Sequence, residues 1–338
     1  MSASRFHSAI LWKRLTEQKV HCFACAHYCT IKPGQYGICG VRKNIDGELF
    51  TNVYENPVAV HPDPIEKKPL YHFLPGSRAL SLGTAGCNFH CDFCQNYDIS
   101  QMRGNEVTGR YLSVNQAVDM AEDYGCKSIA YTYNEPIIFA EYVLDVATKA
   151  KKRGLKNICV SNGFESKEAL DILSDRIDAM NIDLKSFSDK FYRRLCKGRL
   201  EPVLKTIRAT YERGIWIEVT TLIIPGENDS EQEIRDIAHF IASVSRDIPW
   251  HISRFFPTYK MNNLLPTPVK TLDKARQIGL DEGLRFVYVG NTPEEQNVTY
   301  CPKCGQKLIV RSRFELTHIN LQNGCCASCH EPLPGVFL

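Results

Sequence analysis

Short apolar runs alternate with more polar segments through the middle of the chain. The apolar runs predict buried strands near residues 79–84, 128–133, 157–161, 178–184, 215–223, 249–256 and 285–290. Such runs are typical of parallel strands that are covered on both faces. The segments between them predict helices near residues 113–124, 137–153, 166–175, 188–213 (one helix or two), 230–244 and 271–282.

Boundary residues support these predicted helices. Residues that favour the N-cap position stand at Ser113, Ser166, Ser188, Ser230 and Thr271. Glycines that can end a helix stand at Gly125, Gly154, Gly214 and Gly283. The repeated order of strand and helix predicts an α/β fold with a parallel sheet and right-handed crossovers. The units are too few for a closed eight-fold barrel, so we expect a partial (β/α)6-type barrel with ligands at the carboxyl ends of its strands.

Composition adds one unusual feature, the cysteines. The 338 residues are 43% hydrophobic and 23% charged, and the net charge of +3 predicts neither a nucleic-acid surface nor a membrane surface. No apolar run is long enough to cross a bilayer and no secretory leader is recognisable, so we expect a cytoplasmic protein. Fifteen cysteines, most of them clustered, indicate metal binding in a reducing compartment. The isolated ones are interpreted as buried core thiols: Cys126, Cys159 and Cys196.

The cysteine clusters divide the chain into three predicted parts. Residues 1–75 form a Cys-rich, strand-poor N-terminal segment, residues 76–295 the partial barrel, and residues 296–338 a C-terminal zinc-ribbon-like module. The C-terminal set has the spacing of a closed, structural zinc site, with a single rubredoxin-like iron as the alternative; it consists of Cys301, Cys304, Cys326 and Cys329. The N-terminal set also indicates one metal site, either zinc or a second iron–sulfur cluster; it consists of Cys22, Cys25, Cys29 and Cys39.

A third cysteine group follows the first predicted strand. Cys87, Cys91 and Cys94 have C-x3-C-x2-C spacing, which lets one short loop hold three corners of an iron–sulfur cube. A [4Fe–4S] cluster usually takes four thiolates, so one iron would stay open to another ligand. The alternative is a zinc knuckle whose fourth ligand lies elsewhere in the chain.

Polar residues stand at the ends of the next three predicted strands. Glu135 ends the second strand, where a carboxylate would point into a site or favour a helix N-terminus. Ser161 and Asn162 end the third strand, and they can bind a ribose or methionyl group or simply form an Asn-Gly turn. Asp183 and Lys185 share one face of the fourth strand, where the pair can hold a zwitterionic amino acid or form a salt bridge at the barrel mouth.

Together these motifs resemble the radical S-adenosylmethionine (SAM) superfamily, in which SAM occupies the open iron. Phe93 matches the aromatic residue before the third cysteine and is implied to back the adenine. Glu135 matches the acidic residue of a Gly-Gly-Glu-Pro motif that receives the SAM ammonium, although Tyr133 and Asn134 replace the glycines. The resemblance implies cleavage of SAM to a 5′-deoxyadenosyl radical that abstracts hydrogen from an unidentified substrate. It implies SAM contacts at Glu135, Ser161, Asn162, Asp183 and Lys185.

Longer segments resemble the radical SAM component of the AmmeMemoRadiSam system, a family related to pyruvate formate-lyase activating enzymes. The segments that carry this resemblance are Cys22–Cys39 with Gly40-Val-Arg42, Ile65–Pro75, Gly86–Asn96, Tyr131–Pro136 and the terminal Pro332–Gly335. This resemblance implies Memo-like and AMMECR-type proteins as candidate partners. It also implies an electron donor such as flavodoxin or ferredoxin.

Two other functional classes remain open on the sequence. One is an activase that forms a glycyl radical on a protein partner, although Thr220 stands where an activase would carry arginine. The other is a non-catalytic zinc-binding module for nucleic acid or protein. Its weakness is the balanced charge of 41 basic and 38 acidic residues, which predicts no basic surface.

Overall fold

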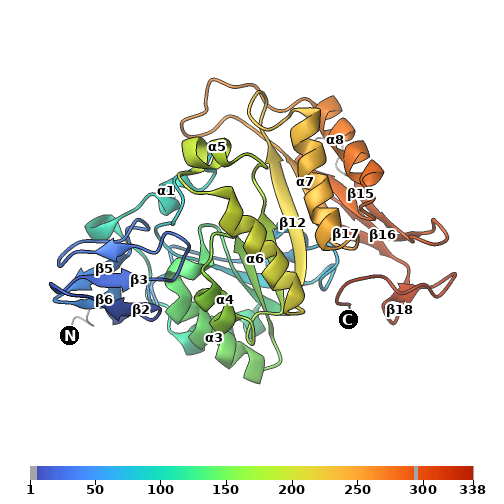
Figure 1. Ribbon diagram of the computed structural model, residues 1–338. Coiled ribbons are helices and arrows are strands. Elements are labelled where there is room, and N and C mark those ends of the chain that lie inside the picture. Colours follow the sequence, from blue (N-terminus) through green and yellow to red (C-terminus); the bar gives the residue numbers. More distant parts are fainter. Residues whose placement is uncertain (1–5, 293–295, 338) are drawn as a thin grey trace.

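An eight-stranded sheet forms the centre of the molecule (Figure 1). The structure is a computed structural model that describes residues 6–292 and 296–337. Strands β8 to β14 are parallel to their neighbours, and β7 is antiparallel to β8 at one edge. The bounds are β7 Ala59–Pro64, β8 Arg78–Gly83, β9 Ser128–Tyr131, β10 Lys156–Ser161, β11 Ala179–Asp183, β12 Trp216–Ile223, β13 Trp250–Arg254 and β14 Val287–Gly290. All seven predicted strands are therefore confirmed, as β8 to β14.

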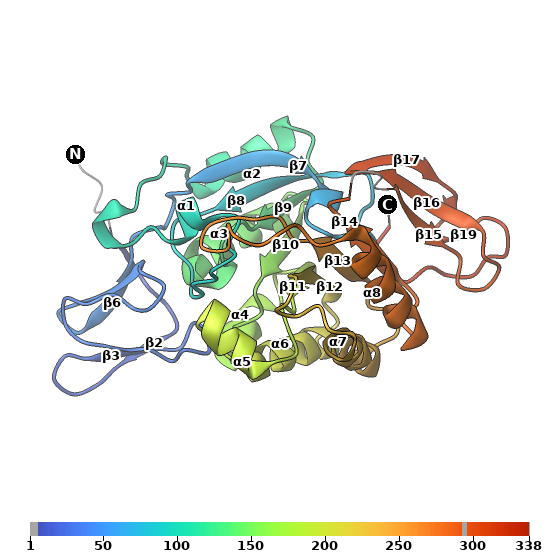
Figure 2. The same ribbon diagram turned by 90° about the horizontal axis from the view of Figure 1, so that it is seen from above.

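Helices connect the parallel strands and lie along the outside of the sheet (Figure 2). The main ones are α2 Val114–Asp123, α3 Ala140–Lys152, α4 Lys167–Leu173, α6 Leu200–Glu212, α7 Glu231–Val244 and α8 Val269–Asp281. Short helical turns are η1 Ile65–Lys67, α1 Tyr97–Ser100, η2 Gly104–Glu106, η3 Pro136–Phe139, α5 Asp189–Phe191 and η4 Tyr192–Cys196. Six crossovers join seven parallel strands, so the predicted α/β fold of the partial-barrel type is confirmed.

The serine N-caps are confirmed and the threonine N-cap is wrong. The side chains of Ser113, Ser166, Ser188 and Ser230 each accept a hydrogen bond from a backbone N–H in the first turn of the helix that follows. Thr271 lies inside α8, which begins at Val269 after the N-cap Pro268. Proline suits this boundary because its fixed φ is compatible with the extended residue that precedes a helix.

The N-terminal segment contains more strand than its sequence predicts. Two small antiparallel sheets have the orders β1-β6-β5 and β2-β3-β4. Their bounds are β1 His7–Ser8, β2 Trp12–Arg14, β3 Val20–Cys22, β4 Thr30–Ile31, β5 Arg42–Ile45 and β6 Glu48–Thr51. These strands have two to four residues, which is too short for an alternating pattern to stand out.

Strand β7 is not among the predicted strands, because its two prolines are typical of a loop. Pro62 and Pro64 pair with Leu80 and Arg78 of β8 in an antiparallel ladder. Proline has no N–H for a ladder, but β7 ends the strand order and needs partners on one side only. The edge position therefore explains how two prolines fit a strand.

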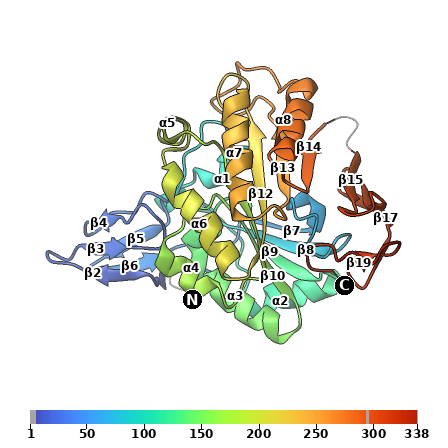
Figure 3. The same cartoon turned by 45° about the vertical axis from the view of Figure 1, so that its right-hand side comes forward.

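The C-terminal residues form a small β module on the side of the sheet opposite the N-terminal sheets (Figure 3). Its strands are β15 Gln296–Tyr300, β16 Lys307–Ser312, β17 Glu315–Ile319, β18 Leu321–Gln322 and β19 Cys325–Cys326. The three-part division at residues 75 and 295 stays a prediction. Within the described ranges, the helices are too short or too polar to span a membrane.

Candidate active site

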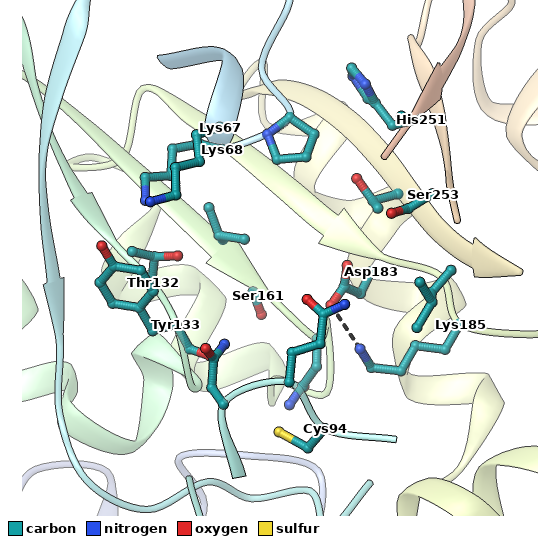
Figure 4. A pocket seen from close by; sticks show the side chains of 18 of the residues that line it. Lys67, Lys68, Cys94, Thr132, Tyr133, Ser161, Asp183, Lys185, His251 and Ser253 are labelled. Carbon is teal, nitrogen blue, oxygen red and sulfur yellow. Dashed lines mark hydrogen bonds and ion pairs between the residues drawn. The ribbon is translucent and has the colours of Figure 1, made fainter. Parts of the chain in front are cut away.

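A cavity of about 540 Å³ opens at the carboxyl ends of the parallel strands. Figure 4 shows Cys94 and Lys185 at one end of this cavity and Lys68 and His251 at the other. The predicted cluster cysteines and strand-end residues meet at the first end, which we call the cluster end. The second, which we call the far end, contains residues that the sequence did not predict.

Strand register explains why one row of side chains lines the cavity. Asp183 of β11 pairs with Thr220 of β12, Thr220 with His251 of β13, and His251 with Tyr288 of β14. Residues that pair across parallel strands point to the same face of the sheet. All four line the cavity. Thr220 therefore lies in the candidate site.

At the cluster end the three predicted cysteines line the cavity together. Burial raises the pKa of Cys87 and Cys94, whereas a hydrogen bond from the Cys196 thiol lowers the pKa of Cys91. Metal ligation requires thiolates, so burial without a bound ion disfavours the binding form of Cys87 and Cys94. Cys196 belongs to η4, and the prediction that it is a buried core thiol is confirmed. The structure also places it against Cys91.

Asp183 and Lys185 form the predicted pair at the cavity wall. Lys185 Nζ lies 2.7 Å from Asp183 Oδ2, and the dashed line in Figure 4 marks this contact. Lys185 Nζ also lies 5.9 Å from the ring centroid of Phe93, which is buried and lines the cavity. The pair therefore offers one negative and one positive charge to a ligand in the cavity.

Glu135 is fully buried behind the cavity wall. Its carboxylate accepts hydrogen bonds from the backbone N–H of Asn162 at 2.8 Å, from Ser161 Oγ at 3.0 Å, and from the N–H of Ile137 as the cap of η3. Ser161 also contacts Glu165, a second buried carboxyl. Burial raises the pKa of Glu135 to about 7 and that of Glu165 to about 8. Both the capping role and the ligand role weighed for Glu135 are compatible with this geometry.

One of the two residues that replace glycines, Tyr133, keeps a backbone conformation that glycine favours. Tyr133 has φ of +73°, in the left-handed region. Its hydroxyl donates to Asp63 Oδ2 at 2.7 Å, and Lys68 Nζ lies 4.6 Å from its ring centroid. Asn134 Nδ2 donates to the carbonyl of Gly86 at 2.7 Å, so this segment is tied to the cysteine loop. These contacts hold a conformation that costs free energy in a tyrosine.

A buried carboxylate and imidazole form the far end. His251 Nε2 lies 2.6 Å from Glu218 Oε2, and Glu218 also accepts from the backbone N–H groups of Tyr71 and His72. Burial alone would raise the pKa of Glu218, but the hydrogen bond from His251 and the nearby charges lower it overall. The carboxylate therefore fixes Nε2 as the protonated nitrogen of His251 and leaves Nδ1 for a ligand.

Residues of the C-terminal module reach this far end. Arg311 Nη1 donates to Thr299 Oγ1 at 3.0 Å, Thr299 Oγ1 lies 2.7 Å from the Tyr288 hydroxyl, and that hydroxyl lies 2.7 Å from His72 Nε2. His72 is neutral, because burial lowers its pKa to about 4. Its Nδ1 donates to a carbonyl, so Nε2 accepts from Tyr288. Phe314, in the β16–β17 turn, lines the cavity itself.

The two outer cysteine sets differ in spacing. The sulfur atoms of Cys301, Cys304, Cys326 and Cys329 all lie within 4.8 Å of one another, so this quartet could hold a metal ion. Among the described residues, no other group of three potential ligands meets that spacing. The N-terminal set instead lines a separate cavity of about 20 Å³, formed in part by Cys22, Cys25, Cys29 and Cys39.

Comparison with known proteins identifies the chemistry of the site. A sequence model of the Radical SAM superfamily matches residues 81–241. The chain is 42% identical to the uncharacterized protein MJ0808 of Methanocaldococcus jannaschii. The alignment spans 329 residues, which are 96% of this chain and 98% of that protein. The chain belongs to the radical SAM superfamily. It is a radical SAM enzyme, and the alternative of a non-catalytic zinc-binding module is excluded.

Two further similarities are more distant. The chain is 28% identical over 214 residues to the putative glycyl-radical enzyme activating enzyme MJ1632 of the same organism, covering 60% of this chain and 78% of that protein. A radical SAM methyltransferase from Sphaerobacter thermophilus has a similar structure, with a TM-score of 0.52, 16% identity, and coverage of 70% of this chain and 71% of that chain. The second likeness shows the fold alone.

Radical SAM enzymes bind a [4Fe–4S] cluster and SAM, and the cavity suits both. Three thiols, rather than four, line its cluster end, which leaves one iron for a ligand. A cavity of about 540 Å³ lies within the usual range for a small-molecule site. Sequence reasoning missed Cys196, Glu218 and His251. The alternation of Glu218 and Thr220 along β12 was the only signal for a polar face there.

Proposed function

We propose that this radical SAM enzyme cleaves SAM reductively at a cluster held by Cys87, Cys91 and Cys94. When bound, the cluster supplies the electron for cleavage to methionine and a 5′-deoxyadenosyl radical, which abstracts hydrogen from the substrate. The observation that carries the proposal is that these three cysteines and the Asp183–Lys185 pair face one cavity. The protein orients SAM, holds the substrate and excludes water.

The residues at the cluster end suit a zwitterionic amino acid such as the methionyl part of SAM. Asp183 and Lys185 offer one charge of each sign to its ammonium and carboxylate. The carboxylate of Glu135, directly behind Ser161 and Asn162, adds negative charge for the ammonium. Phe93 presents an apolar face for the adenine. We keep the SAM contacts at Glu135, Ser161, Asn162, Asp183 and Lys185 as part of the proposal.

The far end suits the substrate, because it adjoins the cluster end within one cavity. His251 presents Nδ1, held in place by Glu218, to a substrate hydrogen-bond donor. Phe314 adds an apolar surface from the C-terminal module.

Anaerobic purification followed by addition of dithionite and SAM tests the proposal, with 5′-deoxyadenosine measured by mass spectrometry. We expect SAM-dependent 5′-deoxyadenosine from the wild-type protein and none from Cys91→Ala. Cys126→Ala, which removes a buried cysteine outside the cavity, is the matched control and should keep the activity. Iron-loaded wild-type protein that releases no 5′-deoxyadenosine would contradict the proposal.

A second candidate is an activase that forms a glycyl radical on a protein partner. The similarity to MJ1632, which is described as a putative glycyl-radical enzyme activating enzyme, favours it. Thr220 in the cavity, where an activase would carry arginine, argues against it. A glycyl-radical signal in electron paramagnetic resonance, formed on a partner enzyme with this chain, SAM and reductant, would establish this second function.

We further propose that the chain is the radical SAM component of an AmmeMemoRadiSam system and acts with Memo-like and AMMECR-type proteins. Two segments that carry the resemblance support this: Ile65–Pro75 supplies cavity residues, and Gly86–Asn96 carries the cluster cysteines. A flavodoxin or ferredoxin would supply the electron. Calorimetric titration of the purified proteins against the anaerobic enzyme tests the partners, and absence of binding by both would refute them.

A further inference from the structure

We propose that Cys22, Cys25, Cys29 and Cys39 bind a thiolate metal centre, of zinc or iron, that braces the cluster-binding loop from behind. Metal binding at these cysteines does not depend on the proposed function. The bracing of the loop rests on the proposed function, because this loop carries Cys87, Cys91 and Cys94. The two parts are tested by different measurements.

The local fold places the four cysteines around one cavity, in which no three of their sulfur atoms all lie within 4.8 Å of one another. Cys22 ends β3, and its backbone N–H donates to the carbonyl of Cys29 at 2.9 Å. Cys25 forms an isolated backbone bridge with Glu165, beyond β10. Cys39 lies within a tight turn in which the Gly40 N–H donates to the Gly37 carbonyl at 2.9 Å, and Gly40 has φ of +76°. Three separate segments therefore point cysteines at one place.

The place where they meet is a small cavity rather than a filled core. Its volume of about 20 Å³ is the size that holds one water-sized particle. Apolar side chains, including Ile31, Ile137 and Ile138, form much of its wall, so a water there would find few polar partners. Four sulfur ligands around such a space suit a soft, thiophilic metal.

A buried arginine supplies the charge that a thiolate centre needs. Arg42 is 1% exposed, and its Nη1 lies 4.0 Å from Cys22 Sγ. Its guanidinium is held by Glu141 at 2.6 Å and by the carbonyls of Ile10 at 2.9 Å and Ile138 at 3.3 Å. A divalent ion bound by four thiolates keeps a net negative charge. The fixed positive charge beside Cys22 stabilises thiolates at this place.

The same segment presses against the cluster-binding loop. A Cβ placed on Gly86, next to Cys87, would lie 2.7 Å from the Cys39 carbonyl oxygen and 2.6 Å from Val41. Arg103 Nη1 donates to the Ile38 carbonyl at 2.5 Å. These contacts leave no gap between the two segments, so an ordered Cys39 segment restrains the loop that follows Gly86.

Arg103 extends the contact to the middle of the loop. Its Nη2 lies 2.7 Å from His90 Nδ1, and the N–H of Gly104 donates to the Gly40 carbonyl at 2.8 Å. His90 stands between the first and second cluster cysteines. The predicted consequence of metal binding at the N-terminal set is therefore a stiffer loop between residues 86 and 104.

Metal analysis of the anaerobically purified, full-length wild-type protein is the first test. The ribbon would hold one zinc and the radical site the iron of one [4Fe–4S] cluster, so we expect either a second zinc or iron beyond one cluster. A second zinc assigns the centre to zinc, and extra iron with its own spectroscopic signature assigns it to iron. Zinc for the ribbon and iron for one cluster, with nothing more after reconstitution, would overturn the proposal.

The second test places the metal and measures the brace. Cys25→Ser/Cys29→Ser changes the two half-buried ligands, and Cys126→Ser is the matched control. We expect the double variant to lose the extra metal and to exchange amide hydrogens at residues 86–104 at least tenfold faster, with unchanged exchange at residues 301–329. If the centre is zinc, the single variant Cys25→His, which keeps a zinc ligand, should retain both the extra metal and the wild-type exchange rate at residues 86–104. Retained metal refutes the assignment, and metal loss without faster exchange refutes the brace.

Discussion

The two cysteine-rich ends of the chain differ in how their sulfur atoms are held. In the C-terminal module, Cys301 and Cys329 sulfurs lie 3.5 Å apart and those of Cys304 and Cys326 lie 3.7 Å apart. Zinc–sulfur bonds of about 2.3 Å place tetrahedral sulfurs about 3.8 Å apart. This site is preformed by its own hairpins. The N-terminal cysteines come from separate segments and surround a cavity, so their site depends on the barrel against which they pack.

Each end is joined to the barrel by a buried arginine and a buried glutamate, and the two pairs differ in geometry. Arg42 Nη2 lies 2.6 Å from Glu141 Oε1, next to the cluster-binding loop. Arg311 Nε lies 3.7 Å from Glu66 Oε1, at the far end of the cavity. The first pair is a direct charge contact, and the second is a looser one supported by neutral partners. We therefore expect the N-terminal end to affect the cluster and SAM, and the C-terminal end to affect the substrate.

Removing the first arginine should have the largest effect. Arg42→Met leaves the carboxylate of Glu141 buried without its cation, and breaking a buried pair in this way costs about 3–5 kcal/mol. We expect this loss in the free energy of unfolding, measured with denaturant. Arg153→Met is the control, because Arg153 pairs with Glu122 at the surface and its loss should cost at most about 1 kcal/mol. Equal losses in the two variants would mean that the buried pair has no special role.

Removing the second arginine should cost less, and the cost should depend on pH. Arg311→Met leaves the Tyr71 carbonyl and Thr299 without a charged donor, a loss of about 2–3 kcal/mol. Burial raises the pKa of Glu66 above its ordinary 4.5, so the folded chain binds this proton more tightly than the unfolded chain. Stability from this group is complete below pH 4.5 and is lost as pH rises through the raised pKa.

The variant removes a cation beside Glu66 and raises that pKa further. The destabilisation by Arg311→Met should therefore be about 2–3 kcal/mol near pH 5, from the lost hydrogen bonds alone, and larger near pH 8, as followed by denaturant unfolding across this range. A pH-independent loss would show that Glu66 stays charged without Arg311. Arg311→Lys, which keeps the positive charge, should keep a flatter profile.

The sequence predicted the parts of this arrangement that local patterns encode. Seven parallel strands, four serine caps and three cysteine groups each carry their signal within a few residues. Strand β7 was missed because Pro62 and Pro64 read as loop, and only its edge position in the assembled sheet makes them acceptable. The left-handed Tyr133 was also invisible, since contacts to Asp63 and Lys68 hold it.

Contacts between distant residues account for what the sequence did not reveal of the site. Cys196 looked isolated because its partner, Cys91, lies more than a hundred residues away along the chain. Glu218 and His251 meet because β12 and β13 are neighbours in a parallel sheet, an order that the sequence does not state. Contacts between side chains on neighbouring strands can therefore be predicted only when the strand order and register are known. The spacing of cysteines within one loop can be read from the sequence directly.

A third prediction concerns SAM at the cluster end of the cavity. The SAM ammonium would bind the ionised form of Glu135, whose pKa burial raises to about 7, so SAM affinity should fall as pH drops below 7. Burial raises the pKa of the neighbouring Glu165 to about 8, so Glu165 is mainly protonated at pH 6.5 and Glu165→Gln removes no charge there. At pH 6.5 the variant should therefore bind SAM as tightly as wild type. At pH 8.5, where Glu165 is largely ionised, the variant should bind SAM more weakly, by at most about tenfold, because the SAM ammonium loses a nearby negative charge.

Calorimetry at pH 6.5 and 8.5 measures this difference, and the two proteins should agree at the lower pH. Glu168→Gln, an exposed position on α4, is the matched control and should follow the wild-type profile. If Glu165→Gln weakens SAM binding equally at both pH values, then Glu165 supports the site through its structure rather than through its charge.

The smallest effect should come from Phe314, the cavity residue of the C-terminal module. Phe314 is 39% exposed, so Phe314→Ala should change the free energy of unfolding by less than about 1.5 kcal/mol. Its change in SAM affinity should stay within twofold, because the proposed SAM contacts lie at the cluster end. Phe93→Ala, at that end, is the comparison and should weaken SAM binding clearly. Equal weakening by both variants would mean that SAM extends across the whole cavity and that the C-terminal module serves SAM rather than the substrate.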